Sequence, residues 1–337
     1  MPASFNDLPL ELVEEILNII DRPCHLPTDQ PTLAALNLTS KSLNILTAWR
    51  LYRAPRYSYS NWPLFSRTLM ARKDLAALVK DLEFIGSDYV DDPLISEKFP
   101  QEVVDHYLAH MKPEKHFPLF ADDDETTTLF TADGDGETSA YIEMDFILPL
   151  CSQTVEAIYV DLMSCHEAFN LIDPPTSLPA LKRLTLDYPN SVEGWSTTLP
   201  VSTALLKAAA PNLQKLSISR VKSSLDFDFC LENLTHLAIW SSAIELDTFG
   251  KLLSLVPNLE KLEYECGEEA KEYGWEPVQA YSTIVLSGEG VGYVKKLKSF
   301  CINIRRCYPW LSEGDEVEDL NYLKRAFTER GVDFKYP

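Results

Sequence analysis

Long apolar runs are missing from this 337-residue sequence. No uninterrupted apolar segment approaches the roughly 20 residues that a membrane-spanning helix needs. The first residues also lack the basic stretch, apolar core and small-residue cleavage site of a secretory signal. These absences disfavour membrane and secreted proteins, so we expect a soluble protein of the cytoplasm, the nucleus or both.

Paired cysteines are missing as well. The seven cysteines form no C-x-x-C pair and are scattered over Cys24, Cys151, Cys165, Cys230, Cys266, Cys301 and Cys307. An odd, dispersed set without a secretory signal predicts reduced thiols. We expect no disulfide framework, no bound metal and no cofactor.

Basic residues are scarce. The chain has 30 lysines and arginines against 51 acids, a net charge of −21. Such a balance repels phosphate backbones and anionic membranes, so we expect neither a nucleic-acid nor a membrane partner. Two explanations of the charge stay open: it keeps the protein soluble, or it attracts a protein with a basic surface.

Motifs for catalysis are incomplete. The segment Asp133-x-Asp135-x-Glu137 begins like a calcium loop but lacks the glycine and the final glutamate of that loop. The pair His106-x-x-x-His110 lacks the glutamate that a zinc hydrolase needs after its first histidine. Gly288-Glu289-Gly290-Val291-Gly292 lacks the spacing of a phosphate loop. We expect a non-enzymatic protein, and a hydrolase or transferase hidden in the chain is the least favoured alternative.

The chain does contain an amphipathic start. Apolar residues recur there at helical spacing and form one broad stripe: Leu8, Leu12, Val13, Ile16, Leu17, Ile19 and Ile20. Pro9 fits a first helical turn, and Pro23 disfavours helical geometry at the residue before it. The pattern predicts a helix that begins near residue 8 and ends near Asp21.

Two more short helices are predicted from Leu33 to Tyr52. Thr32 is a candidate cap for the first, and Thr39 or Ser40 for the second. Three short helices in about fifty residues bury too little apolar surface to close a core of their own. We expect the remaining apolar surface to dock onto the rest of this chain or onto another protein.

This segment resembles the F-box of the fungal F-box proteins. The matching residues are Leu8-Pro9-x-Glu11-Leu12-x-x-x-Ile16-Leu17, Leu33-x-x-Leu36-x-Leu38-Thr39-Ser40-Lys41-Ser42-Leu43 and Trp49-Arg50-Leu51-Tyr52-Arg53, so the likeness covers about residues 5 to 55. The resemblance implies that the F-box binds the Skp adaptor of a cullin-based ubiquitin ligase, while the rest of the chain selects a substrate.

The residues that this resemblance assigns to the Skp adaptor are Leu8, Pro9, Leu12, Ile16, Leu17, Leu36, Leu43 and Trp49. Some of them must form the small core of the F-box itself, and the sequence does not divide the two sets. We expect an F-box at 1–55, a helical connector at 56–80 and a substrate-binding region at 81–337. A protein-interaction scaffold without ligase-directed turnover remains the alternative.

A short apolar phrase recurs in the rest of the chain. Three apolar residues with spacings of three and two appear at Val79-x-x-Leu82-x-Phe84, Val155-x-x-Ile158-x-Val160, Leu181-x-x-Leu184-x-Leu186, Leu213-x-x-Leu216-x-Ile218, Leu234-x-x-Leu237-x-Ile239, Leu259-x-x-Leu262-x-Tyr264 and Leu297-x-x-Phe300-x-Ile302. Their spacing, apart from the first gap, is typical of leucine-rich repeats. We predict an α/β fold in which the three-helix F-box precedes an irregular leucine-rich-repeat-like solenoid of short parallel strands and helices.

Alternation along these strands predicts which side chains point away from the helices. The large or charged side chains among them are five acids and two aromatics, with no base: Glu83, Tyr159, Asp161, Asp187, Trp240, Glu263 and Glu265. All except Glu83 are candidate substrate contacts, since solenoids use such a face for partners. A solvated sheet surface is the other interpretation.

Two further segments complete the prediction. An insertion at about 86–145 has 16 acids against three lysines, and we expect a disordered loop there. A helix at 317–330, stopped by Gly331, and a last strand at Val332–Phe334 are predicted to cap the stack.

Overall fold

The computed structural model describes residues 8–21, 30–55, 62–84, 147–161, 177–188, 202–220, 228–242, 244, 246–266, 282–286, 296–303 and 318–336. The acidic insertion predicted at 86–145 lies wholly outside these residues. So do the histidine pair at 106 and 110, the calcium-like segment at 133–137 and the glycine-rich segment at 288–292.

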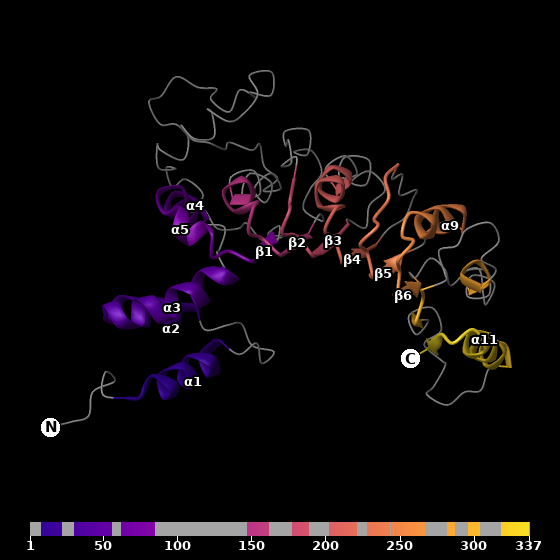
Figure 1. The fold of residues 1–337 in the computed structure, drawn as a ribbon, viewed down its shortest axis with the longest axis horizontal. Coiled ribbons are helices and arrows are strands. Elements are labelled where there is room, and N and C mark those ends of the chain that lie inside the picture. The colour runs from indigo at the N-terminus through magenta and orange to yellow at the C-terminus, as the bar shows by residue number, and fades with distance from the viewer. Residues whose placement is uncertain are drawn as a thin grey trace, which may run out of the picture.

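Three short helices open the chain and form what we call the N-terminal module (Figure 1): α1 (Leu10–Asp21), α2 (Gln30–Thr39) and α3 (Lys41–Arg53). The Ser40 side chain caps α3 by accepting a 3.2 Å hydrogen bond from the backbone N–H of Leu43. Thr32 is the third residue of α2, so its predicted capping role is wrong. The helix begins earlier because Pro31 fits a first turn, where its missing N–H costs nothing.

The connector is helical, as predicted, but it is split at Arg72 into α4 (Trp62–Ala71) and α5 (Lys73–Ala76). Leu69 is fully buried, and Phe65 packs against the same core. The Phe65 ring also stacks on Tyr52 of α3 with centroids 6.2 Å apart. The connector therefore joins the N-terminal module to the start of the sheet.

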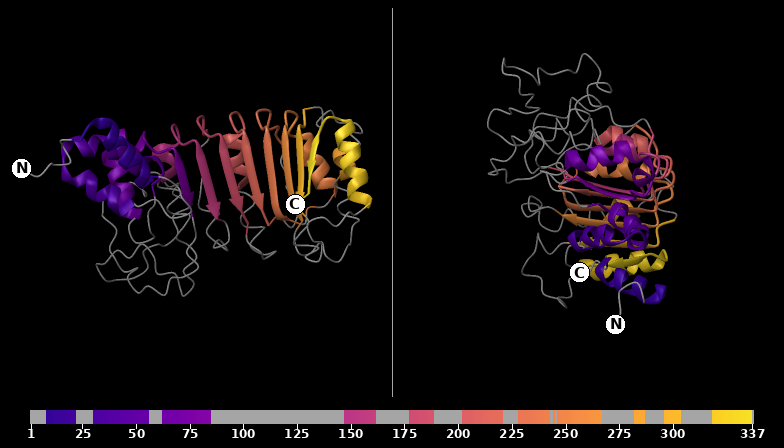
Figure 2. Two further views of the ribbon diagram at one scale, coloured as in Figure 1. Left: turned by 90° about the horizontal axis from the view of Figure 1, so that it is seen from below. Right: turned by 90° about the vertical axis from the view of Figure 1, so that its left-hand side faces the viewer.

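Eight parallel strands form one sheet in sequence order, with the N-terminal module at the β1 end and α11 at the β8 end (Figure 2). The strands are β1 (Asp81–Phe84), β2 (Ala157–Asp161), β3 (Arg183–Asp187), β4 (Lys215–Ser219), β5 (His236–Ser242), β6 (Lys261–Cys266), β7 (Ser299–Asn303) and β8 (Asp333–Lys335). This architecture confirms the predicted α/β fold with leucine-rich-repeat-like stacking.

The strands are aligned by their recurring apolar phrase. The middle residue of each phrase pairs with the middle residue of the next, which gives one ladder: Leu82, Ile158, Leu184, Leu216, Leu237, Leu262, Phe300 and Phe334. The eighth copy lacks its first apolar residue because Gly331 stands there. Gly331 has φ +73° and ends α11 (Glu318–Glu329), as predicted.

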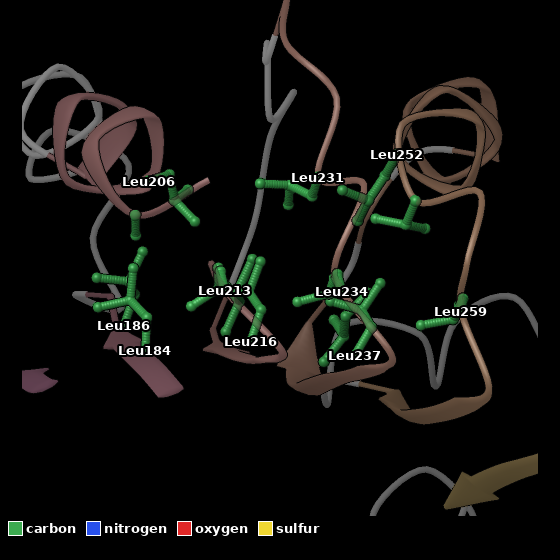
Figure 3. Packing of buried hydrophobic residues seen from close by; sticks show 14 of the residues in the cluster. Leu184, Leu186, Leu206, Leu213, Leu216, Leu231, Leu234, Leu237, Leu252 and Leu259 are labelled. Atoms are coloured by element: carbon green, nitrogen blue, oxygen red, sulfur yellow. The ribbon is translucent and has the colours of Figure 1, made fainter. Parts of the chain in front are cut away.

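Helices cover one face of the sheet and bury this ladder in a continuous core. The helix at 202–209 and α9 (Leu246–Ser254) bring Leu206 and Leu252 over the strand leucines (Figure 3). The turns before the strands are also stacked, because the amides of Asn233 and Asn258 each donate a 2.6 Å hydrogen bond to a carbonyl of the preceding repeat. The opposite face of the sheet, which we call the open face, carries none of the helices that the structure describes (Figure 2).

Candidate interaction surfaces

The N-terminal module has a very small core of its own. Four side chains are buried together, namely Val13, Leu17, Leu33 and Leu43, and four more apolar residues pack partly against them. Polar bonds supplement this packing. The buried guanidinium of Arg50 donates 2.8 Å hydrogen bonds to the Asn18 side chain of α1 and to the Leu46 carbonyl. Helices α2 and α3 therefore pack closely on each other, whereas α1 is held to them by few contacts.

The structure divides the predicted adaptor-binding residues into three groups by their burial. Leu17 and Leu43 are buried and belong to the core of the module, so they present no surface to a partner. Ile16 and Leu36 are half-buried. The remaining four are exposed: Leu8, Pro9, Leu12 and Trp49. Half of the predicted set is thus exposed, although Leu8 and Trp49 only to 36% and 38%.

Further exposed apolar side chains surround this set. On α1, the exposed fractions are 55% for Leu10, 52% for Leu12 and 58% for Ile19, and on α2 and α3 they reach 86% for Leu38 and 73% for Ile45. Leu12 and Ile19 are seven positions apart, so they lie on one side of α1. Exposed apolar residues gathered on one small unit are typical of a protein interaction site. Leu10, Ile19, Leu38 and Ile45 were absent from the predicted set, although Ile19 was part of the apolar stripe.

The six predicted substrate contacts lie on the open face, on β2, β3, β5 and β6. Asp161 pairs directly with Asp187, and Trp240 is two strands further along the same row. The Trp240 indole donates a 3.1 Å hydrogen bond to the Ser217 hydroxyl on β4. The sheet register therefore brings together residues that are far apart in the sequence.

Asp187 is already engaged within the chain. Its carboxylate is 2.5 Å from the Arg220 guanidinium and accepts a 3.3 Å hydrogen bond from the Tyr159 hydroxyl. Partial burial, followed by the nearby charges of Asp187 and Asp161, raises the pKa of Tyr159 to about 12. The sequence did not point to Arg220. This residue has φ 61°, and it donates hydrogen bonds from its side chain to the Tyr188 carbonyl and from its backbone N–H to the Trp240 carbonyl.

The two glutamates on β6 are engaged as well. Glu265 is only 7% exposed and accepts a 3.1 Å hydrogen bond from the Asn303 amide, so the prediction that it points freely into solvent is wrong. Glu263 forms an ion pair with Lys261 and lies 3.7 Å from the His236 ring. Asn303 and His236 come from the neighbouring strands β7 and β5, whereas Lys261 lies two residues before Glu263 on β6 itself, on the same face of the sheet.

The prediction that the open face has no base is also wrong. Each central strand begins one residue before the middle of its phrase, at a position that points to the open face. These first residues are Arg183, Lys215, His236 and Lys261, and they pair in register from β3 to β6. We call them the basic row. Arg183 is additionally joined to Asp81 across β2 at 2.8 Å.

Comparison of the chain with models of known protein families finds no match, and comparison with curated proteins finds none either. In the part of the chain that the structure describes, no three His, Cys, Asp or Glu side chains cluster in a way that would hold a metal ion. Across the same residues, no helix has the length and apolar character to cross a membrane. The surfaces themselves therefore carry the functional argument.

Proposed function

We propose that this protein is the substrate-recognition subunit of a Skp-cullin-F-box ubiquitin ligase. In this role the N-terminal module is an F-box that binds the Skp adaptor, and the repeat sheet binds a protein substrate. The observation that carries the proposal is the exposed apolar surface of a module whose own core holds only four side chains. The resemblance of this segment to fungal F-boxes identifies the adaptor as the partner.

Docking has a sufficient driving force on this surface. Full burial of an exposed leucine or isoleucine contributes about 1.5–3 kcal/mol. Leu10, Leu12 and Ile19 on α1 are each more than half exposed. Burial of several such side chains offsets the cost of ordering an interface and of losing translational freedom.

The arrangement of the two regions suits an adaptor. The N-terminal module lies beyond the β1 end of the sheet, and the open face remains uncovered by it (Figure 2). A Skp subunit on the module and a substrate on the sheet can therefore be bound together. The contribution to ubiquitination is proximity, since binding holds the substrate near the ubiquitin-loaded enzyme.

The test is co-purification of a Skp-type subunit with the double variant Leu12→Asp, Ile19→Asp. Both side chains are exposed, so the substitutions leave the cores intact, while two carboxylates in an apolar interface abolish binding. The matched control is Leu246→Asp, which changes a leucine that is 40% exposed in the repeat region. The control retains the adaptor. Retained binding by the double variant, with an unchanged thermal unfolding curve, overturns the proposal.

A second measurement separates a ligase subunit from a scaffold that only binds the Skp adaptor. Proteins bound by the repeat region are first identified by proximity labelling with the proteasome blocked. Their half-lives are then measured, with the proteasome active, in cells that express the wild-type protein and in cells that express the double variant. If the protein is a ligase subunit, its bound partners have longer half-lives in cells with the double variant than in cells with the wild-type protein. Equal half-lives in the two cell lines indicate a scaffold that does not direct turnover.

A further inference from the structure

The basic row is an unexpected feature of a chain with a net charge of −21. Arg183, Lys215, His236 and Lys261 are directly paired on four successive strands. Neighbouring strands are about 4.8 Å apart, so the row spans about 14 Å across the open face. Sequence reasoning missed it because the four residues are 21 to 32 positions apart and adjacent only in the sheet.

This juxtaposition is unfavourable in the protein alone. Like charges on directly paired residues repel one another. The effect is visible at His236: burial lowers the pKa of its ring, and Lys261 and Lys215 lower it further, against the opposing influence of Glu263. The row therefore places three charged side chains, Arg183, Lys215 and Lys261, at the N-terminal ends of their strands, with the His236 ring between two of them.

Acids on the open face lie near three of the four members of the row. Asp81 pairs with Arg183, and Glu263 pairs with Lys261 and approaches His236. Among the described residues, no ion pair involves Lys215 at the centre. A free anionic partner is therefore favoured most strongly at Lys215.

Three acids of the open face, unlike Lys215, have side-chain partners within the chain. Asp187 is bonded to Arg220 and Tyr159, Glu265 to Asn303, and Glu263 to the basic row itself. These three acids are therefore engaged by other side chains of the same chain.

Small side chains border the basic row. In the next outward row of the sheet, Thr185, Ser217 and Ala238 are directly paired. The Trp240 indole on β5 reaches the Ser217 hydroxyl, and Ala238 is only 5% exposed, so this second row is partly covered. Arg183 and Lys215 themselves are exposed, so a partner can reach their charged groups.

We propose that the basic row binds an acidic segment of a partner protein, lying extended across β3 to β6. In an extended chain, alternate side chains are about 6.6 Å apart, so two or three carboxylates fit the length of the row. The inference rests on the proposed function in one respect: the acidic segment belongs to the substrate of the ligase.

The test is fluorescence anisotropy of a labelled octa-glutamate peptide with the full-length protein. General attraction is excluded as a cause of binding, because the protein is itself strongly acidic. We expect binding that weakens about ten-fold in Arg183→Glu, Lys215→Glu and about ten-fold when sodium chloride rises from roughly 50 to 300 mM. Lys215→Gln alone, which removes one charge without reversing it, weakens binding less.

The matched control is Lys207→Glu, Lys251→Glu, which gives the same net charge by changing exposed lysines on the helices. It is expected to bind the peptide within about two-fold of the wild type, since these charges are far from the row and screened. Absence of peptide binding at low salt, or equal weakening by the control pair, overturns the proposal. Co-purification of the Skp-type subunit is measured on the same variants, so failure of this site is distinguishable from failure of the adaptor function.

Discussion

The repeat sheet and the N-terminal module use similar apolar residues in opposite ways. In the sheet, one buried cluster extends from Leu69 to Phe334 and includes residues of all eight strands. Among the described apolar side chains of the module, only Val13, Leu17, Leu33 and Leu43 are buried, while several leucines and isoleucines on α1 to α3 remain exposed. A repeat has a neighbour that buries its apolar face, whereas the exposed leucines and isoleucines of the module are not covered by the described part of the chain; under the proposed function the Skp-type adaptor covers them.

The difference between the two regions is tested most directly by truncating one leucine in each. Leu237 is fully buried on β5, so Leu237→Ala is expected to lower the free energy of unfolding by about 3 kcal/mol, because it leaves a cavity. Leu12→Ala is expected to change it by less than about 0.5 kcal/mol, since Leu12 is already in contact with water. Urea denaturation followed by circular dichroism measures both. Equal losses contradict the division between the regions.

A smaller effect is expected from the cap of α3. Ser40→Ala removes a hydrogen bond to the Leu43 N–H and costs about 1 kcal/mol, which raises amide exchange in α3 about five-fold. Thr39→Ala is the control, because the Thr39 hydroxyl bonds only the Leu36 carbonyl within α2. The core of the module is very small, so exchange is expected to rise there and not in the strands. A rise of the same size in the sheet indicates that the two regions unfold as one unit.

The smallest effect concerns the polar open face. The pKa of His236 is lowered below its ordinary 6.5, by burial first and by Lys261 second. Its contribution to stability is therefore present above pH 6.5 and is lost as the pH falls through the lowered value. NMR titration of the ring is expected to give a higher midpoint in Lys261→Ala and a lower one in Glu263→Gln. An unchanged midpoint in both variants contradicts the electrostatic coupling along the row.

The strands of the fold were predictable because their signal is local. Three apolar residues with spacings of three and two recur at each of the first seven strands, and the middle residues pair in register from Leu82 to Phe300. The last strand was found from the helix-stop signal at Gly331. Backbone alternation then fixes which residues face the helices. Nothing beyond short segments of sequence was needed for these conclusions.

The surfaces were predictable only in part. The apolar stripe on α1 is so broad that it does not reveal which side faces α2 and α3, and Val13 and Leu17 proved to be inside while Leu12 and Ile19 are outside. Alternation along the strand correctly placed Asp187 on the open face. Its neutralisation by Arg220 was not foreseen, because Arg220 follows a different strand, 33 positions later.

The sequence alone determined that this chain alternates helices and short parallel strands behind a small helical module with surplus apolar surface. Periodic apolar residues are enough for this, since helices and strands differ in the spacing of their buried side chains. Only the tertiary structure decided which apolar residues of the module face outward and that bases from four strands form one row. Both depend on contacts between residues far apart in the chain, which no local pattern records.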